Sequence, residues 1–334
     1  MFAALGEALV DLIEHPDGRY EPCLGGSVCN FTRAVARQGL PIRYLNPLST
    51  DTFGERFVAG LRADGVAIDP PWRSHLPTSL AVVSLGAGGV PQYVFHREAV
   101  ADRDGSVDEL LQRLPTELHA LHVGGLALMP PDEQRALAVI EATRARGGLV
   151  SVDANLRMVV AGSDPARQMA YRQAVQRVLA QADVVKLSDE DVQALGWHLD
   201  LDDDASLRAV ARRLLDGLGG VDGRQGHRAS LVALTLGGQG AALVNAGAFV
   251  RLPVRAGLAV VDTVGAGDCF QAGLLSWLHH AGQLKATALQ ALGARELHDA
   301  LQHAMAAAAL NVQRQGCQPP SWLETRAFAD QPVR

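Results

Sequence analysis

Hydrophobic and polar positions follow two different periods that alternate along most of the chain. Short apolar runs, such as G-L-V-S-V-D (148–153), V-V-K-L-S (184–188) and L-V-A-L-T-L-G (231–237), are separated by segments whose apolar residues recur every three or four positions. The first pattern is typical of buried strands and the second of amphipathic helices. Their regular succession predicts an α/β fold with a mainly parallel sheet and helices on both faces.

Polar residues lie where several of the predicted strands end. Three pairs occupy such places: Asp153 with Asn155, Lys186 with Ser188, and Thr235 with Gly237. Ligands of parallel sheets bind outside the carboxyl ends of the strands. We therefore expect the functional site at this edge of the sheet.

Two segments interrupt the alternation. Residues 9–24, with P-D-G, and residues 77–98, with G-A-G-G, each resemble a hairpin closed by a glycine turn. They predict either a small β-sheet that acts as a lid over the ligand edge or ordinary edge strands of the main sheet. The span 201–230 predicts a helix followed by a surface loop near 217–229.

Composition narrows the classes of function. The chain has 334 residues, 48% of them hydrophobic, which allows one large or two modest domains. With a net charge of −6 and a pI near 6.0, we expect no nucleic-acid or membrane partner. No run is long enough to span a bilayer. The cysteines form no C-x-x-C pair, and Glu7 and Asp11 interrupt the first apolar run, which argues against a signal peptide. A cytoplasmic, reduced setting is expected.

The stretch V-D-T-V-G-A-G-D-C-F (261–270) carries the clearest chemical signal. Apolar residues at Phe270, Leu274 and Leu278 predict a helix that begins at this turn. The free amides of a helix start attract phosphate, and glycines let the backbone approach it. Asp268 would lie beside the phosphate as a general base for an attacking hydroxyl. The alternative is that Asp268 only caps the helix.

Six motifs in order make the chain resemble the ribokinase-like, or PfkB, carbohydrate kinases. They are G-E-A-L-V-D (6–11), L-G-G-S-V-C-N-F (24–31), S-T-D-T-F-G (49–54), D-A-N-L-R (153–157), T-L-G-G-Q-G (235–240) and D-T-V-G-A-G-D (262–268). The resemblance implies a single ribokinase-like three-layer α/β/α domain over residues 1–334 with a small β-sheet lid. It also implies an ATP-dependent sugar kinase that uses Mg²⁺ and K⁺.

The resemblance assigns roles to individual residues. Asp11, Gly25, Gly26 and Asn30 would bind sugar hydroxyls, and Asp268 would be the base, with Gly265, Ala266 and Gly267 forming the anion hole. Lys186, Ser188, Thr235, Gly237, Gly240 and Asn311 would bind the nucleotide, and Asp262 would lie near a monovalent cation. The family's N-x-x-E motif, which is linked to magnesium, appears here as S-D-E-D. Asp191 would therefore bind magnesium, and Glu190 is the alternative residue for this role.

The sugar depends on two arginines. Arg97, at the end of a lid strand, would reach over a neutral ketose if Arg157 is structural, and both together would clamp a carboxylate. Y-V-F-H-R-E-A-V-A-D-R (93–103) and D-A-N-L-R resemble the branch that contains the fructokinases and the 2-keto-3-deoxygluconate kinases. The likeness of L-N-P-L-S-T-D-T-F-G (45–54), A-D-R (101–103) and V-Q-R-Q-G-C-Q-P-P (312–320) to bacterial fructokinases favours fructose. The alternatives are 2-keto-3-deoxygluconate and a non-catalytic sugar or nucleotide sensor. His96 and His122 are expected to be structural. Apolar lid positions Val82, Val94 and Phe95 predict a homodimer through the lids.

Overall fold

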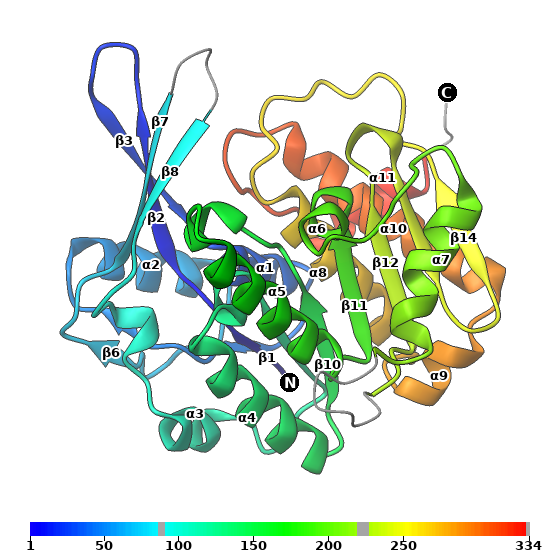
Figure 1. Cartoon of the computed structure of the whole chain (residues 1–334), viewed down its shortest axis with the longest axis horizontal. Coiled ribbons are helices and arrows are strands. Elements are labelled where there is room, and N and C mark those ends of the chain that lie inside the picture. Colours follow the sequence, from blue (N-terminus) through cyan, green and yellow to red (C-terminus); the bar gives the residue numbers. More distant parts are fainter. Residues whose placement is uncertain (86–90, 219–226, 332–334) are drawn as a thin grey trace.

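Eight strands form the central sheet, in the order β14-β13-β12-β11-β10-β9-β1-β4. The computed structural model describes residues 1–85, 91–218 and 227–331 (Figure 1). The strands of this sheet are β1 (Phe2–Leu5), β4 (Ile42–Tyr44), β9 (Ala120–Gly124), β10 (Leu149–Asp153), β11 (Val184–Ser188), β12 (Leu231–Thr235), β13 (Ala241–Val244) and β14 (Phe249–Leu252). Neighbouring strands are parallel from β4 to β12, and β13 runs antiparallel to both β12 and β14.

Helices cover both faces of this sheet. The helices are α1 (Ser27–Arg37), α2 (Thr52–Ala63), α3 (Val107–Arg113), α4 (Asp132–Ala145), α5 (Pro165–Leu179), α6 (Asp189–Ala194), α7 (Asp204–Leu215), α8 (Ala266–His280), α9 (Ala286–Ala291), α10 (Ala294–Val312) and α11 (Trp322–Ala329). Short 3-10 turns are η2 (Ala101–Arg103), η3 (Gly125–Leu128), η4 (Met158–Ala161) and η5 (Gly237–Gln239).

Side-chain alternation along β1 shows how the layers form. Phe2 and Ala4 pack into the core under α1, α8 and α10, whereas Ala3 and Leu5 pack into the core under α3, α4, α5 and α7. Because successive side chains of a strand point to opposite faces, one short apolar strand contributes to both cores. The predicted three-layer α/β/α architecture is confirmed.

A separate four-stranded sheet, ordered β3-β2-β7-β8, extends from the body of the molecule (Figure 1). Its strands are β2 (Leu9–Glu14), β3 (Tyr20–Gly25), β7 (Ser79–Leu85) and β8 (Pro91–His96), and a two-stranded sheet joins β5 (Leu48–Ser49) to β6 (Arg73–Ser74). The small sheet predicted from 9–24 and 77–98 is therefore present, and the edge-strand alternative is wrong. The G-A-G-G turn at 86–89 lies outside the described residues.

The helix predicted within 201–230 is α7, and most of the loop that follows it, residues 219–226, lies outside the described residues. None of the helices in the described part of the chain combines the length and apolar character needed to cross a bilayer.

Candidate active site

The turn V-G-A-G-D begins α8 at the ligand edge of the sheet. Gly265 is the N-cap, with a left-handed φ of 77°, and a Cβ at this position would lie 2.4 Å from Sγ of Cys317. Only glycine satisfies both constraints. The amide of Ala266 donates to the Thr263 carbonyl at 3.2 Å, and the next amides, of Gly267 and Asp268, have no carbonyl within the helix to accept them. Of the amides at this turn, those of Gly267 and Asp268 are therefore the ones available to an anion, whereas that of Ala266 is occupied.

Asp268 does not cap its own helix. Its carboxylate accepts hydrogen bonds from Oγ of Ser27 at 2.7 Å and from Nδ2 of Asn30 at 3.1 Å, both on α1. The side chain is buried, and Oδ1 of Asn30 is a buried oxygen without a hydrogen-bond partner among the described residues. The helix-cap alternative is therefore wrong, and Asp268 occupies a polar position between two helix starts.

Opposing effects act on the protonation of Asp268. Burial raises the pKa of this carboxyl above the usual aspartate value. Hydrogen bonds from Ser27 and Asn30, and the positive charges of Lys186 and Arg157, oppose that rise. Such a carboxylate is poised to accept a proton closer to neutral pH than an exposed aspartate would.

Lys186 provides a positive charge beside the anion hole. Its Nζ lies 2.9 Å from both carboxylate oxygens of Asp153, and both side chains are buried. A Cβ on Gly267 would lie 3.2 Å from the same Nζ. Burial raises the pKa of Asp153 to about 6 even with this partner. A phosphate at the start of α8 would therefore meet an ammonium group that is already oriented.

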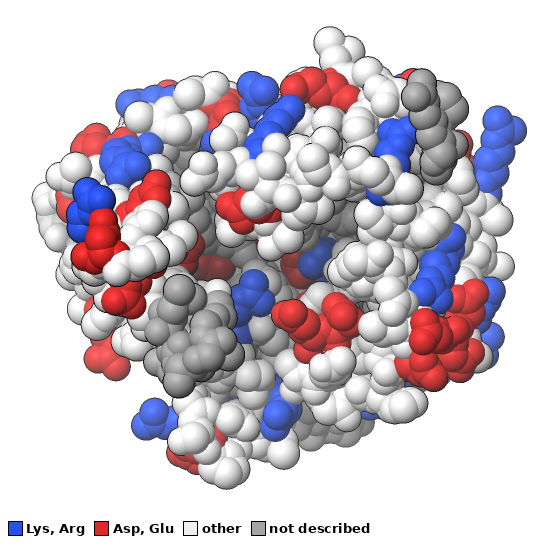
Figure 2. Space-filling view, turned by 90° about the horizontal axis from the view of Figure 1, so that it is seen from above, with Lys and Arg blue, Asp and Glu red and all other residues white. Residues whose placement is uncertain are grey.

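A cavity of about 660 Å³ opens at the ends of β10, β11 and β12. Among the predicted site residues, its walls include Arg157, Lys186, Ser188, Glu190, Thr235, Gly237, Gly240, Ala266 and Gly267. Apolar residues of α10, such as Met305, Ala309 and Val312, line the opposite wall. In Figure 2, which looks onto this end of the molecule, charged side chains of both signs lie in and around a hollow. The volume and lining suit a ligand with a flat apolar group and an anionic tail.

The predicted nucleotide turn follows β12. Gly237 has φ 52° and Gly240 has φ 98°, and a Cβ on Gly240 would lie 2.0 Å from the carbonyl oxygen of Leu252. Gly240 is thus required by the close approach of β14, and it lines the cavity together with Thr235 and Gly237.

Asp11 and Arg157 lie on the small-sheet side of Asp268. Burial raises the pKa of Asp11 to about 6, and the positive charge of Arg157 opposes this rise. A Cβ on Gly25 would lie 2.6 Å from Oδ2 of Asp11, so a larger residue would displace this carboxylate. Arg157 acts on Asp11 and Asp268 and lines the cavity, which argues against a purely surface role.

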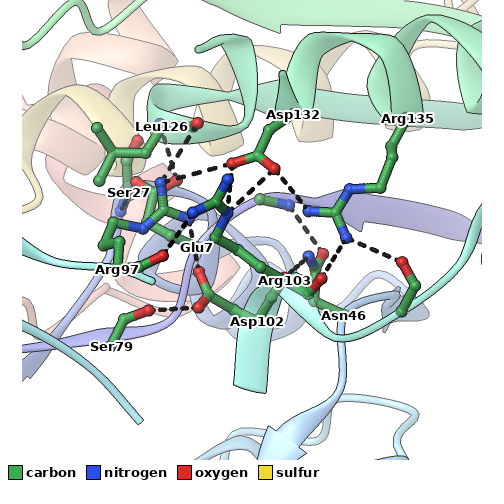
Figure 3. A network of polar contacts seen from close by, with 12 residues as sticks. Glu7, Ser27, Asn46, Ser79, Arg97, Asp102, Arg103, Leu126, Asp132 and Arg135 are labelled. Carbon is green, nitrogen blue, oxygen red and sulfur yellow. Dashed lines mark hydrogen bonds and ion pairs between the residues drawn. The ribbon is translucent and has the colours of Figure 1, made fainter. Parts of the chain in front are cut away.

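Arg97 departs from its predicted position over the sugar. Its side chain is only 10% exposed, its Nη2 lies 2.9 Å from Oδ2 of Asp102, and its Nη1 lies 3.9 Å from Asp132 (Figure 3). These carboxylates turn the guanidinium into the protein, beneath the small sheet. The two predicted arginines therefore do not converge on one ligand.

Asn311 is a second correction, because its side chain is fully buried and does not line the cavity. Its Nδ2 donates to the carbonyl of Val264 at 2.7 Å, and its Oδ1 accepts from the amide of Gln318 at 2.9 Å. Asp262 has a similar supporting position, since its carboxylate accepts from the amides of Val264 and Gly316. Both residues hold the turn that precedes α8.

Asp191 is a third correction. It is 1% exposed, and its two oxygens accept amides of Leu156 and Ser188 at 2.7 Å each, the latter within a capping box that begins α6. Its neighbour Glu190 is exposed and lines the cavity. Across residues 1–85, 91–218 and 227–331, no three His, Cys, Asp or Glu side chains form a metal-binding group. Magnesium commonly binds through one or two carboxylates, water and substrate phosphates, and Glu190 suits that mode.

Sequence reasoning missed two residues near Asp268. Ser27 belongs to the motif L-G-G-S-V-C-N, but its hydroxyl was given no role. Glu7 is 3% exposed and accepts the amide of Ser27 at 3.1 Å. A glutamate inside an apolar strand run was the available signal, because a buried carboxylate requires donors or a cation.

Comparisons with known proteins agree with this geometry. Residues 1–325 match the pfkB family of carbohydrate kinases. A fructokinase from Rhizobium leguminosarum bv. trifolii is 30% identical over 282 residues, which are 83% of this chain and 79% of that protein. A fructokinase from Escherichia coli is 30% identical over 287 residues, 83% of this chain and 84% of that protein.

Solved structures are similar over nearly the full length. The crystal structure of a fructokinase with bound ATP from Xylella fastidiosa has a TM-score of 0.82 and 25% identity, covering 98% of this chain and 97% of that one. A fructokinase double mutant from Vibrio cholerae O395, with fructose, ADP and potassium ion bound, has a TM-score of 0.77 and 27% identity, with 98% of each chain covered. The motifs, the site geometry and these matches together show that the chain belongs to the pfkB family of carbohydrate kinases.

Proposed function

We propose that this protein is an ATP-dependent fructokinase that phosphorylates a primary hydroxyl of fructose. The observation that carries the proposal is the position of Asp268. Its carboxylate lies at the open start of α8, with Lys186 on the cavity side and Asp11 on the small-sheet side, while Arg157 lines the cavity and acts on both Asp268 and Asp11. A base between an anion site and a polyol site is the arrangement that phosphoryl transfer to an alcohol requires.

In this mechanism Asp268 removes the proton of the attacking hydroxyl as its oxygen bonds to the γ-phosphorus, while the bond from that phosphorus to the β,γ-bridging oxygen breaks and ADP leaves. The amides at the start of α8 and the ammonium of Lys186 stabilise the charge on the transferring group. Asn30, whose Oδ1 lacks a donor among the described residues, would accept a hydroxyl of the sugar. Magnesium bound with ATP would neutralise phosphate charge, with Glu190 and Ser188 as the residues that face it.

Fructose is favoured over 2-keto-3-deoxygluconate by the position of Arg97. A carboxylate sugar calls for converging guanidinium groups, but of the two predicted arginines Arg97 is paired with Asp102 and Arg157 alone lines the cavity. Similarity to several fructokinases supports the same choice.

Two finer features belong to the same proposal. Potassium would support the turn that Asp262 and Asn311 hold, as suggested by the neighbour that contains this ion. A homodimer would cover the face of the small sheet that carries Val94, which is 55% exposed and is paired with Val82 of β7. Light scattering of the wild type and of Val94→Glu would test the dimer, which we expect the substitution to weaken.

Coupled ATP turnover with fructose, 2-keto-3-deoxygluconate, ribose and tagatose, in the presence of magnesium and with or without potassium, tests the function. We expect the highest kcat/KM with fructose and a dependence on potassium. A preference for 2-keto-3-deoxygluconate would mean that Arg157 alone recognises the carboxylate and that fructose is wrong. Failure of every sugar to stimulate ATP consumption would favour the sensor alternative.

A further inference from the structure

A buried carboxylate at the end of β1 joins two helix starts. Oε1 of Glu7 accepts the amide of Ser27 at 3.1 Å, and Oε2 accepts the amide of Leu126 at 3.0 Å (Figure 3). Ser27 begins α1, and Leu126 lies in the first turn of η3. Glu7 thus supplies the acceptor that the N-terminus of α1 lacks, because its N-cap, Gly26, has no side chain.

The backbone of this segment also packs closely against Glu7. Gly26 has φ 95°, and a Cβ on it would lie 2.5 Å from the main-chain oxygen of Glu7. That oxygen accepts the amide of Cys29 at 3.3 Å. Main chain and side chain of one residue therefore fix the start of α1.

Ser27 connects this anchored start to the base. Its amide is bound by Glu7, and its hydroxyl donates to Oδ1 of Asp268 at 2.7 Å. A displacement of Ser27 would therefore remove a hydrogen bond from the carboxylate that performs the proposed proton transfer.

A cluster of charged residues keeps Glu7 in place. Burial raises the pKa of Glu7 to about 7, and the positive charge of Arg97, just after β8, opposes the rise. Arg97 is held by Asp102, which accepts a hydrogen bond from Ser79 at the start of β7 (Figure 3). Arg103 and Arg135 in turn bind Asp132, the second carboxylate near Arg97. The start of β7 and the end of β8, where these strands join the body of the molecule, are thus connected to Glu7, which anchors Ser27.

We propose that Glu7 is a positioning residue for phosphoryl transfer, which fixes Ser27 so that its hydroxyl orients Asp268. Arg97 and Asp102 tie this pair to the base of the small sheet. The inference rests on the proposed function, because it takes Asp268 as the base. It gives Arg97 a role beneath the site in place of the predicted contact with the sugar.

Several other groups surround the two carboxylates and are relevant to any pH measurement. Asp268 is faced by Lys186 from β11, Asp153 from β10, Arg157 after β10, and the thiols of Cys29 and Cys269. Glu7 is faced by Arg97, Asp102, Tyr44 and Tyr171.

The test compares kcat as a function of pH, at saturating sugar and ATP, for the wild type, Ser27→Ala, Glu7→Gln and the double variant. Loss of the Ser27 hydrogen bond raises the pKa of Asp268, so the acid limb of the profile should move to higher pH by about half a unit or more. Glu7→Gln should move it in the same direction and lower kcat about tenfold, with less than a threefold change in the KM for sugar. In the double variant the shift should not exceed that of Ser27→Ala alone.

A matched control is Glu133→Gln. Glu133, on α4, is another buried glutamate, and it pairs with Arg177 of α5. We expect thermal destabilisation without movement of the acid limb. If Glu7→Gln does not fold, as judged by its melting curve, Glu7→Asp keeps the charge but shortens the reach to Ser27, and it should show an intermediate shift.

Three results would overturn the inference. Glu7→Gln or Glu7→Asp could lower kcat equally at every pH, as a structural lesion would. The two shifts could add in the double variant, so that Glu7 does not act through Ser27. The acid limb could move to lower pH in Glu7→Gln, which would mean that Glu7 itself titrates in turnover. Undiminished turnover by Asp268→Asn would instead refute the role of Asp268 as the base, on which the inference rests, while failure of every sugar to stimulate ATP consumption would refute the proposed function.

Discussion

The starts of α1 and α8 differ although both begin after a glycine with positive φ and without a side-chain cap. At α1 the protein fills the helix start itself, since Glu7 accepts the first amide and its main-chain oxygen accepts another. At α8 the following amides face a cavity, and the nearest cation, Lys186, is held from behind by Asp153. The same local geometry thus serves stability when an internal carboxylate occupies it and ligand binding when it is left open.

The largest expected effect comes from removing the base at the open start. Asp268→Asn should lower kcat by about 10³-fold, because general-base catalysis commonly contributes 10²- to 10⁴-fold. The amide oxygen can still accept the hydroxyl of Ser27, so sugar and ADP should bind with nearly wild-type affinity. Steady-state kinetics measures the loss in kcat, and calorimetry measures the affinities for sugar and ADP. Near-normal turnover would refute the role of Asp268.

Lys186→Met tests whether the ammonium group beside the start of α8 stabilises the fold as well as the bound nucleotide. It leaves Asp153 as an unpaired buried carboxylate, which typically costs about 3–5 kcal/mol of unfolding free energy. The loss should be smaller at pH 5 than at pH 8, because the pKa of Asp153, already raised to about 6, rises further without the lysine and protonation then neutralises the group. Denaturant unfolding at both pH values measures this.

The double variant Lys186→Met with Asp153→Asn provides the control for that prediction. It should recover much of the stability but not the affinity for ATP, because the cation beside Gly267 is still missing. Recovery of both would show that Lys186 has no direct part in nucleotide binding.

Gly26→Ala tests the filled helix start. A Cβ at φ 95° and 2.5 Å from a backbone oxygen cannot be accommodated by a rotamer change, so we expect a loss of about 1–3 kcal/mol in unfolding free energy. Thermal unfolding at constant ligand concentration measures it. An unchanged melting temperature would contradict the close approach of Glu7 to α1.

Gly267→Ala tests the start of α8, whose amides face the cavity, and should have the smallest effect of these substitutions. Alanine suits a helix, so stability should not fall, but the new Cβ lies 3.2 Å from the ammonium nitrogen of Lys186 and narrows the anion hole. We expect the KM for ATP to rise about tenfold. Gly60→Ala, in α2 with no described atom within 4 Å of its Cβ position, is the matched control and should leave the KM unchanged.

Local sequence patterns were sufficient to predict the layers of the fold and part of the candidate site. Period-two and period-3.6 apolar spacing predicted the sheet and its helices, and the polar residues at strand ends predicted the cavity wall at Lys186 and Thr235. These features depend on neighbours in sequence, or on the general rule that parallel strands end at one edge.

Side-chain direction was not predictable in the same way. Whether Arg97 reached outward depended on the carboxylates of Asp102 in η2 and Asp132 in α4. The internal hydrogen bonding of Asp191 could have been foreseen, because S-x-x-D can form a capping box that engages the carboxylate of its last residue. Glu7 was unassigned because its partners, Ser27 and Leu126, come together only in the fold.

The hydrogen bond between Ser27 and Asp268 spans 241 positions of the chain. On the ribosome, Ser27 emerges long before the turn that carries Asp268 is made. The early strands and helices can pack while the catalytic position is still being synthesised, but the base reaches its hydroxyl partner only after α8 has left the exit tunnel. A nascent or truncated chain that ends before α8 would therefore lack activity even with its N-terminal layers folded, and catalytic competence is among the last properties that this protein acquires.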